Sequence, residues 1–323
     1  MSNSNFIKQD DLLVESLTKN MGYYFRSGSV LYKTKTEFQD LEIHEVPRFG
    51  KILRLDEVFQ TSEKDEFLYH EPLAHVPGIA MNGGKRALVI GGGDGGSAEE
   101  LLKYPEMEKV VMVELDRGVV DACKEYIPSI SNGVFDSDRL ELRFEDGIKY
   151  IEDRAQSNEK FDQIILDLTD PFGPSVALYT KEFYESVNKI LNPGGAMSLH
   201  IESPITRPDI FATLYHTLKS VFRHVRPMLN YVPMYGSLWG YASASQEVDP
   251  LLLSESEVKE RIESLGLTKL QFYNEKTHFS LMALPNYVQE LLANPREPFT
   301  KSNLPDIEED FTEGLAIFKN TNQ

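Results

Sequence analysis

Short apolar runs alternate with segments of helical periodicity through the middle of the chain. The apolar runs predict strands at 87–90, 110–113, 140–144, 161–166 and 196–201. The segments between and after them predict helices from 97, at 118–126, from 147 to 151, at 181–190 and at 208–222. A predicted hairpin over 225–233 and 238–244 and helices at 255–264 and 284–292 follow. Strands that alternate with helices predict an α/β fold with a mostly parallel, Rossmann-like sheet.

The pattern differs ahead of this region. Residues 23–70 contain short runs typical of β structure, with a turn at 47–50, which predicts a small N-terminal antiparallel β domain. We expect residues 1–20 to form a loose amphipathic helix around Leu12, Leu13 and Leu17, or to be partly disordered. A predicted helix at 66–75 leads into the main domain. The predicted organisation is an N-terminal β domain, a catalytic domain and a polar C-terminal tail, at 1–75, 76–295 and 296–323.

A glycine-rich turn follows the first predicted strand of the main domain. Five of the six residues at 91–96 are glycine, and the exception is Asp94. Glycine lets a backbone approach a ligand closely and adopt positive φ. Glu114 comes about 20 residues later, where an acidic side chain binds both ribose hydroxyls in nucleotide-binding folds. The turn also matches the G-x-G-x-x-G dinucleotide pattern, so an NAD-dependent oxidoreductase is an alternative.

Asp94 distinguishes these interpretations. A carboxylate beside a pyrophosphate would repel it, because two unit charges about 4 Å apart interact by roughly 1–4 kcal/mol at effective dielectric constants of about 80 to 20. The same carboxylate would attract a cation. We therefore expect a nucleoside that carries positive charge and no phosphate.

Composition narrows the possible partners. The chain has 323 residues, 33 Lys and Arg against 51 Asp and Glu, and a formal charge of -18, which disfavours nucleic acids and anionic membranes. The single cysteine, Cys123, excludes an intramolecular disulfide and a thiolate metal cluster, and we expect it to be a packed core residue. We find no secretory signal and no apolar run of about 18 residues, so we expect a cytoplasmic protein that does not span a membrane.

Acidic residues follow four of the predicted strands. They are Asp94, Glu114, Asp146, Asp167 and Asp170. Ligands of open parallel sheets bind at the carboxyl ends of the strands, so these side chains should converge on one crevice. Glu114 suits a ribose diol and Asp146 an exocyclic adenine amine, which leaves the other three carboxylates for positive charge. Any one of them could instead be a helix cap.

Six motifs give the chain its resemblance to a known family. They are EFQD at 37–40, QTSEKDEFLYHE at 60–71, GGGDGG at 91–96, VELD at 113–116, EDG at 145–147 and DLTDPFGP at 167–174. With them the chain resembles the polyamine aminopropyltransferases over roughly residues 30–290. The resemblance implies a methyltransferase-type Rossmann-like domain and decarboxylated S-adenosylmethionine as co-substrate, with no prosthetic group. The acceptor would be a diamine or polyamine, and the assembly a homodimer or homotetramer.

The resemblance also implies a donor site. Its predicted residues are Gln39, Gly91, Gly93, Asp94, Glu114, Asp146, Gly147 and Pro174. In this interpretation Asp94 pairs with the ammonium of the aminopropyl group. It would repel intact S-adenosylmethionine, which keeps a carboxylate near that place.

The predicted acceptor site overlaps the donor site. Its residues are Gln60, His70, Asp94, Asp167, Asp170 and Tyr235, and the predicted catalytic residues are Asp167, Tyr69 and Tyr235. By the resemblance, Asp167 is the general base that accepts a proton from the attacking amine, helped by Tyr69. Asp170 would anchor the diamine, and Tyr235 would orient the attacking nitrogen.

Two departures from the family pattern leave the acceptor open. Many members carry Asp-Ser-Ser-Asp or Asp-Ser-Thr-Asp where this chain has 167–170, and Thr-Tyr-Pro-Ser-Gly near Tyr235, where this chain has Met-Tyr-Gly-Ser-Leu-Trp. Putrescine is the favoured acceptor; cadaverine, 1,3-diaminopropane and spermidine are alternatives. A polyamine-binding protein without activity is a third class. His70 and His75 lack the i, i+4 spacing of a zinc helix, and we expect no metal.

Overall fold

A seven-stranded sheet forms the centre of the computed structural model, which describes residues 12–305. The strand order is β12-β13-β11-β10-β7-β8-β9. The strands are β7 (Arg86–Gly91), β8 (Lys109–Glu114), β9 (Leu140–Phe144), β10 (Phe161–Asp167), β11 (Leu191–Glu202), β12 (His224–Val232) and β13 (Ser237–Ser245). β9, β8, β7, β10 and β11 are parallel, and β13 pairs antiparallel with both β11 and β12. The mostly parallel sheet and its final hairpin are therefore confirmed.

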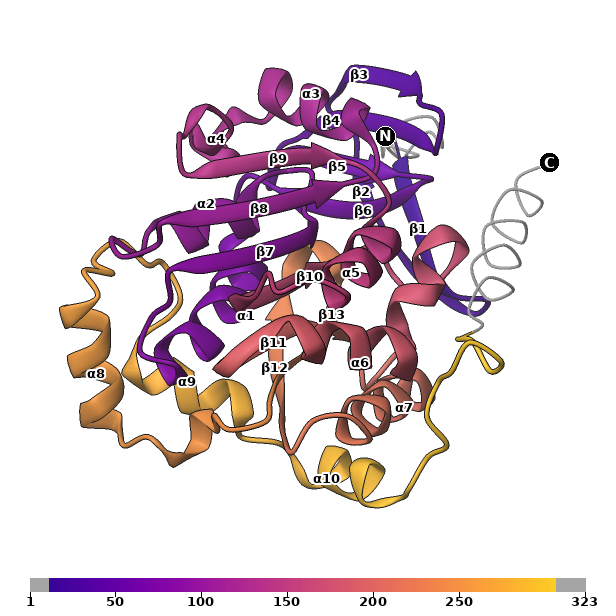
Figure 1. Ribbon diagram of the computed structural model, residues 1–323. Helices are drawn as coiled ribbons and strands as arrows, with labels where there is room; N and C mark the ends of the chain where they lie inside the picture. Colours follow the sequence, from indigo (N-terminus) through magenta and orange to yellow (C-terminus); the bar gives the residue numbers. More distant parts are fainter. Residues whose placement is uncertain (1–11, 306–323) are drawn as a thin grey trace, which may run out of the picture.

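Helices cover both faces of this sheet (Figure 1). They are α1 (Phe67–Ala80), α2 (Gly96–Leu102), α3 (Arg117–Tyr126), α4 (Pro128–Ser131), α5 (Gly147–Ala155), α6 (Lys181–Ile190), α7 (Pro208–Lys219), α8 (Glu255–Ser264), α9 (Glu275–Met282) and α10 (Asn286–Ala293). Short 3-10 helices are η2 (Val134–Asp136), η3 (Gly173–Tyr179), η4 (Pro233–Tyr235) and η5 (Pro250–Leu252). α4 and α9 were not predicted from the sequence.

The alternation of side chains along each strand produces two separate cores. Ala87 and Val89 of β7 pack in one core with α1 and α2, whereas Leu88 and Ile90 pack in the other with α5, α6 and α7. Successive side chains of a strand point to opposite faces, so a strand covered on both faces has to be apolar throughout. This requirement explains the short continuous apolar runs in the sequence.

Two small antiparallel sheets precede α1 and lie beside the carboxyl ends of the parallel strands (Figure 1). One is the hairpin β1 (Leu12–Thr18) and β2 (Met21–Arg26). The other contains β3 (Ser29–Lys35), β4 (Asp40–Val46), β5 (Gly50–Leu55) and β6 (Val58–Ser62), and it packs on α3 and α4 around the buried Cys123. The antiparallel N-terminal structure and the core position of Cys123 are confirmed.

The predicted helix near the N-terminus is wrong over the residues that the structure describes. Residues 12–18 form β1, in which Leu13, Glu15 and Leu17 are all buried. The buried Glu15 lies between two leucines on the inward face, and this charge concealed the period of two in the sequence. Residues 1–11 lie outside the described residues.

The first part of the predicted surface tail is mostly exposed or half-buried, but it is anchored to the main domain at Phe299. Phe299 is buried against the core that contains α6 and α7, and its amide donates to Thr217 Oγ1 at 3.0 Å. Residues 306–323 lie outside the described residues.

Candidate active site

A cavity of about 270 Å³ opens where β7, β8, β9 and β10 end. The chain leaves β7 toward β8 and β9 on one side and returns to β10 on the other, so the crevice lies at the switch point of the sheet. The four-stranded sheet contributes the opposite wall through Gln39, Leu55 and Gln60. The cavity is thus enclosed by segments far apart in the sequence.

Backbone contacts fix the glycine turn against β10. Gly91 has φ +80° and pairs in register with Asp167, and a Cβ on Gly91 would lie 2.1 Å from the carbonyl oxygen of Asp167. The amide of Gly92 donates to the same carbonyl at 2.9 Å. Only glycine fits this close approach and this backbone conformation.

Asp94 lies in the wall of the cavity and is only 9% exposed. Its Oδ1 accepts a hydrogen bond from the amide of Gly96 at 2.9 Å, which orients the carboxylate. Its Oδ2 lies 3.6 Å from Nε2 of His70. The glycine turn therefore presents a carboxylate to the cavity, and its role toward a cationic ligand stays a prediction.

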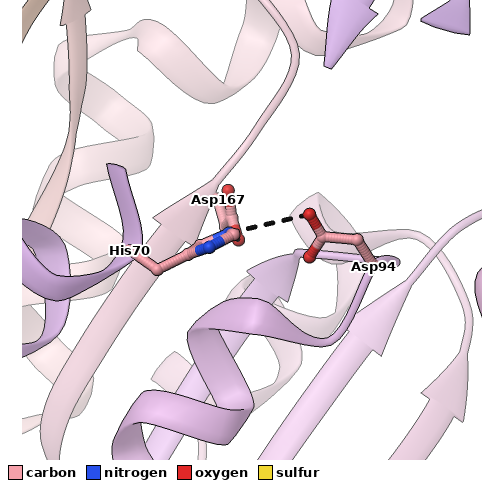
Figure 2. Close-up of side chains that lie close together, drawn as sticks. All are labelled: His70, Asp94 and Asp167. Carbon is pink, nitrogen blue, oxygen red and sulfur yellow. Dashed lines mark ion pairs between the residues drawn. The ribbon is translucent and has the colours of Figure 1, made fainter. Parts of the chain in front are cut away.

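His70 lies between two carboxylates, Asp94 and Asp167 (Figure 2). Its Nε2 is 3.8 Å from Oδ2 of Asp167, and its Nδ1 is 2.7 Å from Oε2 of Glu66, one helical turn earlier. Burial alone would lower the pKa of His70, but Asp94, Glu66 and Asp167 together raise it to about 10. The carboxylates around His70 therefore favour its imidazolium form, which would offset part of their negative charge.

Asp167 ends β10 and faces the cavity. The hydroxyl of Ser97, in the first turn of α2, donates to Oδ2 of Asp167 at 2.7 Å. Burial raises the pKa of Asp167, while His70 and the hydroxyls of Ser97 and Tyr69 lower it. A carboxylate with a raised pKa and a fixed orientation is suited to accept a proton at neutral pH.

Uncharged and acidic groups line the other end of the cavity, at β8 and β9. Oε1 of Glu114 accepts from the amide of Asp116 at 2.8 Å, and burial raises the pKa of Glu114 to about 7. Asp146 caps α5 through the amide of Ile148 at 2.7 Å and lines the cavity as well, so it is both a cap and a site residue. Nε2 of Gln39 donates to Asp116 at 2.9 Å. Gly93 and Gly147 also line this end, which we call the nucleoside end.

A smaller hollow of about 30 Å³ adjoins the cavity behind two tyrosines. We call it the inner chamber. It shares Gln60, Tyr69, Leu168 and Tyr235 with the larger cavity. Its own walls are Glu15, Val58, Phe59, Asp170, His200 and Trp239. Asp170 therefore faces this chamber, whereas the other four acids line the larger cavity.

Tyr235 stands at the entrance to the inner chamber. Its hydroxyl donates to the carbonyl oxygen of Gln60 at 2.8 Å, and its ring packs against Tyr69 and Trp239 with centroids 5.9 and 4.9 Å apart. Because its hydrogen is engaged by the backbone, Tyr235 would contact an amine through its oxygen. Pro174 lies in η3, whose Ser175 and Leu178 line the cavity.

Several polar residues of the site were not predicted. Glu66 could have been found from its i, i+4 spacing to His70, and Ser97 from its place directly after the glycine turn. Glu202 follows a predicted strand, as the predicted acids do. Glu15 was harder to recognise as a site residue, because in the sequence it only interrupts a short apolar stretch and belongs to no motif.

Two groups of side chains in residues 12–305 have the composition of metal ligands. They are His70 with Asp94 and Asp167, and Asp170 with His200 and Glu202. In the first group the carboxylates raise the pKa of His70 itself to about 10, so its ring nitrogens carry protons, and in the second group the guanidinium of Arg207 lies beside Asp170 and Glu202. These cations disfavour a metal ion, and the absence of a metal stays a prediction.

The site and the fold together define a class. A methyltransferase-like sheet presents a carboxylate at its glycine turn, where a dinucleotide enzyme needs room for phosphate, and this arrangement suits a cationic nucleoside.

Comparisons with known proteins support the same class of protein. The family model described as spermine/spermidine synthase domain matches residues 66–252, and the one described as spermidine synthase tetramerisation domain matches residues 13–63.

Two relatives of this chain bear the same name. The polyamine aminopropyltransferase of Nitrosomonas europaea is 46% identical over 302 residues, covering 93% of this chain and 92% of the relative. That of Caldicellulosiruptor saccharolyticus is 39% identical over 279 residues, covering 86% and 96%. This chain belongs to the spermine/spermidine synthase family of polyamine aminopropyltransferases.

Solved structures confirm the fold. Spermidine synthase from Thermotoga maritima is 33% identical with a TM-score of 0.81, and the match covers 91% of this chain and 98% of that one. A spermidine synthase in complex with the transition state analogue AdoDATO has the same identity and coverage and a TM-score of 0.82. Within residues 12–305, none of the helices has the length and hydropathy required to cross a bilayer.

Proposed function

We propose that this protein is a spermidine synthase. It transfers the aminopropyl group of decarboxylated S-adenosylmethionine to putrescine, which gives spermidine and 5'-methylthioadenosine. The observation that carries the proposal is the placement of Asp94, His70 and Asp167 between a nucleoside end and an inner chamber for an amine.

The donor would occupy the larger cavity. Glu114 would accept hydrogen bonds from the ribose hydroxyls, and Asp146 from the adenine amine. The ammonium of the aminopropyl group would lie against Asp94. Because an ammonium there would bring a second positive charge beside Asp94, donor binding would favour loss of the His70 proton.

The acceptor would enter between Tyr69 and Tyr235. Its distal ammonium would reach Asp170 in the inner chamber, and its methylenes would pack on Val58, Leu168 and Trp239. A reference amine pKa of about 10.4 means that the attacking nitrogen arrives protonated. Asp167 would take that proton.

The reaction is then one displacement. The nitrogen lone pair forms a bond to the aminopropyl carbon next to the sulfonium, and the carbon–sulfur bond breaks with its electron pair going to sulfur. Sulfur leaves as the neutral thioether of methylthioadenosine. Proton transfer to a positioned base contributes typically about 10²–10⁴-fold, and alignment of the two substrates contributes further.

An acceptor assay tests the proposal. Purified protein with decarboxylated S-adenosylmethionine and putrescine should release equal amounts of methylthioadenosine and spermidine, measured by mass spectrometry. A panel with cadaverine, 1,3-diaminopropane and spermidine would identify another acceptor. If methylthioadenosine fails to form with every amine, the proposal is wrong. Asp94 at the glycine turn disfavours the NAD-dependent alternative, because its carboxylate would repel a pyrophosphate.

We also propose a homo-oligomer. The model described as a tetramerisation domain matches residues 13–63, which include both small sheets, and light scattering would distinguish a dimer from a tetramer.

A further inference from the structure

A buried arginine lies behind the acidic wall of the inner chamber. Arg207 immediately precedes α7 and is 4% exposed. Its Nη1 donates to Oε2 of Glu202 at 3.0 Å and lies 3.6 Å from Oδ2 of Asp170. Its Nη2 donates to the carbonyl oxygen of Leu17 at 2.7 Å. One guanidinium thus joins the β1–β2 hairpin, the end of β11 and the loop after β10.

The backbone holds Glu202 in place for this contact. Glu202 is fully buried and has φ +69°, a left-handed conformation that is uncommon for residues other than glycine. Such a conformation persists where the surroundings determine it, and it is often associated with functional sites. Here it places the carboxylate of Glu202 beside Arg207 and Asp170.

The charges around the chamber nearly cancel. Burial raises the pKa of Glu15 to about 8, so Glu15 is mostly uncharged at neutral pH, and burial lowers the pKa of His200, which keeps it neutral. Burial also raises the pKa of Asp170, and it raises that of Glu202 to about 7, so the two carboxyls together supply between one and two negative charges at neutral pH, of which Arg207 balances one. The chamber therefore has a net charge of about minus one at most.

We infer that Arg207 sets the acceptor specificity of this enzyme, because it cancels one carboxylate charge and leaves the chamber matched to the single distal ammonium of a diamine. A triamine such as spermidine would bring a second ammonium into the same buried region. The size of the chamber agrees with a single terminal ammonium, since the chamber measures about 30 Å³ beside a cavity of about 270 Å³. The inference rests on the proposed function and names its acceptor class.

The first test removes the positive charge. Arg207→Met should raise the ratio of kcat/KM for spermidine to kcat/KM for putrescine at least about tenfold relative to wild type. Arg207→Lys keeps the charge and is the matched control, with a ratio within about threefold of wild type. Binding of methylthioadenosine, measured by calorimetry, reports whether each variant keeps a folded nucleoside end. A role of Arg207 in structure alone would lower the activity with both amines by the same factor and would overturn the inference.

The second test separates charge from shape. Glu202→Gln keeps Arg207 and removes one negative charge, so KM for putrescine should rise at least about tenfold while kcat changes less than about threefold. The double variant Glu202→Gln/Arg207→Met loses one charge of each sign and should regain the wild-type preference between the two amines. An unchanged KM for putrescine in Glu202→Gln overturns the inference even if Arg207→Met does not fold.

The wild-type enzyme separates this inference from the proposed function. Absence of methylthioadenosine with every acceptor would remove the proposed function. Turnover of wild type with a preference for spermidine would keep the aminopropyl transfer and overturn the role of Arg207. Turnover with putrescine, together with the shifts above, supports both.

Discussion

The two ends of the active-site cavity are built in different ways. At the nucleoside end, Glu114 and Asp146 are held by backbone amides one or two residues away in the sequence. At the acceptor end, Asp170 is held by Arg207, which also bonds to Glu202 and to the N-terminal hairpin. Glu114 and Asp146 are thus oriented by local turns, whereas Asp170 is oriented by long-range contacts.

This difference suggests how the site can change. A turn that caps a helix is specified by a few neighbouring residues. The orientation of the side chains at the nucleoside end should therefore depend little on substitutions elsewhere. The acceptor end depends on a buried network in which each charge affects its neighbours, and loss of one partner leaves the others uncompensated. Acceptor preference should therefore respond to substitution more readily than donor preference. Four variants test the comparison.

Asp167→Asn should give the largest effect at the acceptor end. It removes the proton acceptor and should lower kcat by about 10²–10⁴-fold. Methylthioadenosine would contact the other end, so its Kd, measured by calorimetry, should be unchanged. An equal loss of nucleoside affinity would show that the two ends are not separable and would remove Asp167 from the role of base.

Asp94→Asn tests the boundary between the two ends. Loss of the carboxylate should raise KM for decarboxylated S-adenosylmethionine by about 10–100-fold, because the ammonium of the donor loses its partner. Methylthioadenosine has no aminopropyl group and should bind as in wild type. Weaker binding of methylthioadenosine would mean that Asp94 supports the glycine turn and has no direct role toward the ammonium.

Glu114 should make the nucleoside end sensitive to pH. Its folded-state pKa of about 7 lies above its ordinary value, so it takes up a proton as the pH falls, and a protonated carboxyl binds the ribose hydroxyls less well. Affinity for methylthioadenosine should therefore fall about tenfold between pH 8 and pH 6 in wild type. Glu114→Gln should bind weakly at both pH values. A similar pH dependence in the variant would assign the titration to another group.

Ser97→Ala should give the smallest effect. The hydroxyl of Ser97 lowers the pKa of Asp167, so its loss should raise that pKa and move the acidic limb of the kcat–pH profile to higher pH. We expect kcat to fall by about three- to tenfold near neutral pH, the size of one ordinary hydrogen bond. Ser97→Thr keeps the hydroxyl and should restore both the rate and the profile. A lower rate with an unshifted profile would indicate a packing role.

The same contrast explains what the sequence could predict. Strands buried on both faces, a glycine turn and acids at strand ends are local patterns, and they predicted the sheet and the placement of Asp94, Glu114, Asp146 and Asp167. The inner chamber joins Glu15 to residues more than 150 positions away, and no local pattern specifies such a neighbour. Glu15 also misled the secondary-structure prediction, because a buried acid in a strand looks like the polar face of a helix. The roles of the site residues in donor binding, acceptor binding and catalysis stay predictions until the variants are measured.

The contact between Gly92 and the carbonyl of Asp167 has a consequence for how such enzymes diversify. It is made by main-chain atoms at the ends of adjacent parallel strands. The geometry of the sheet therefore fixes the distance between Asp167, the proposed base, and the glycine turn that would bind the sulfonium nucleoside. New amine preferences can then arise in the chamber walls without disturbing the alignment of nitrogen, carbon and sulfur.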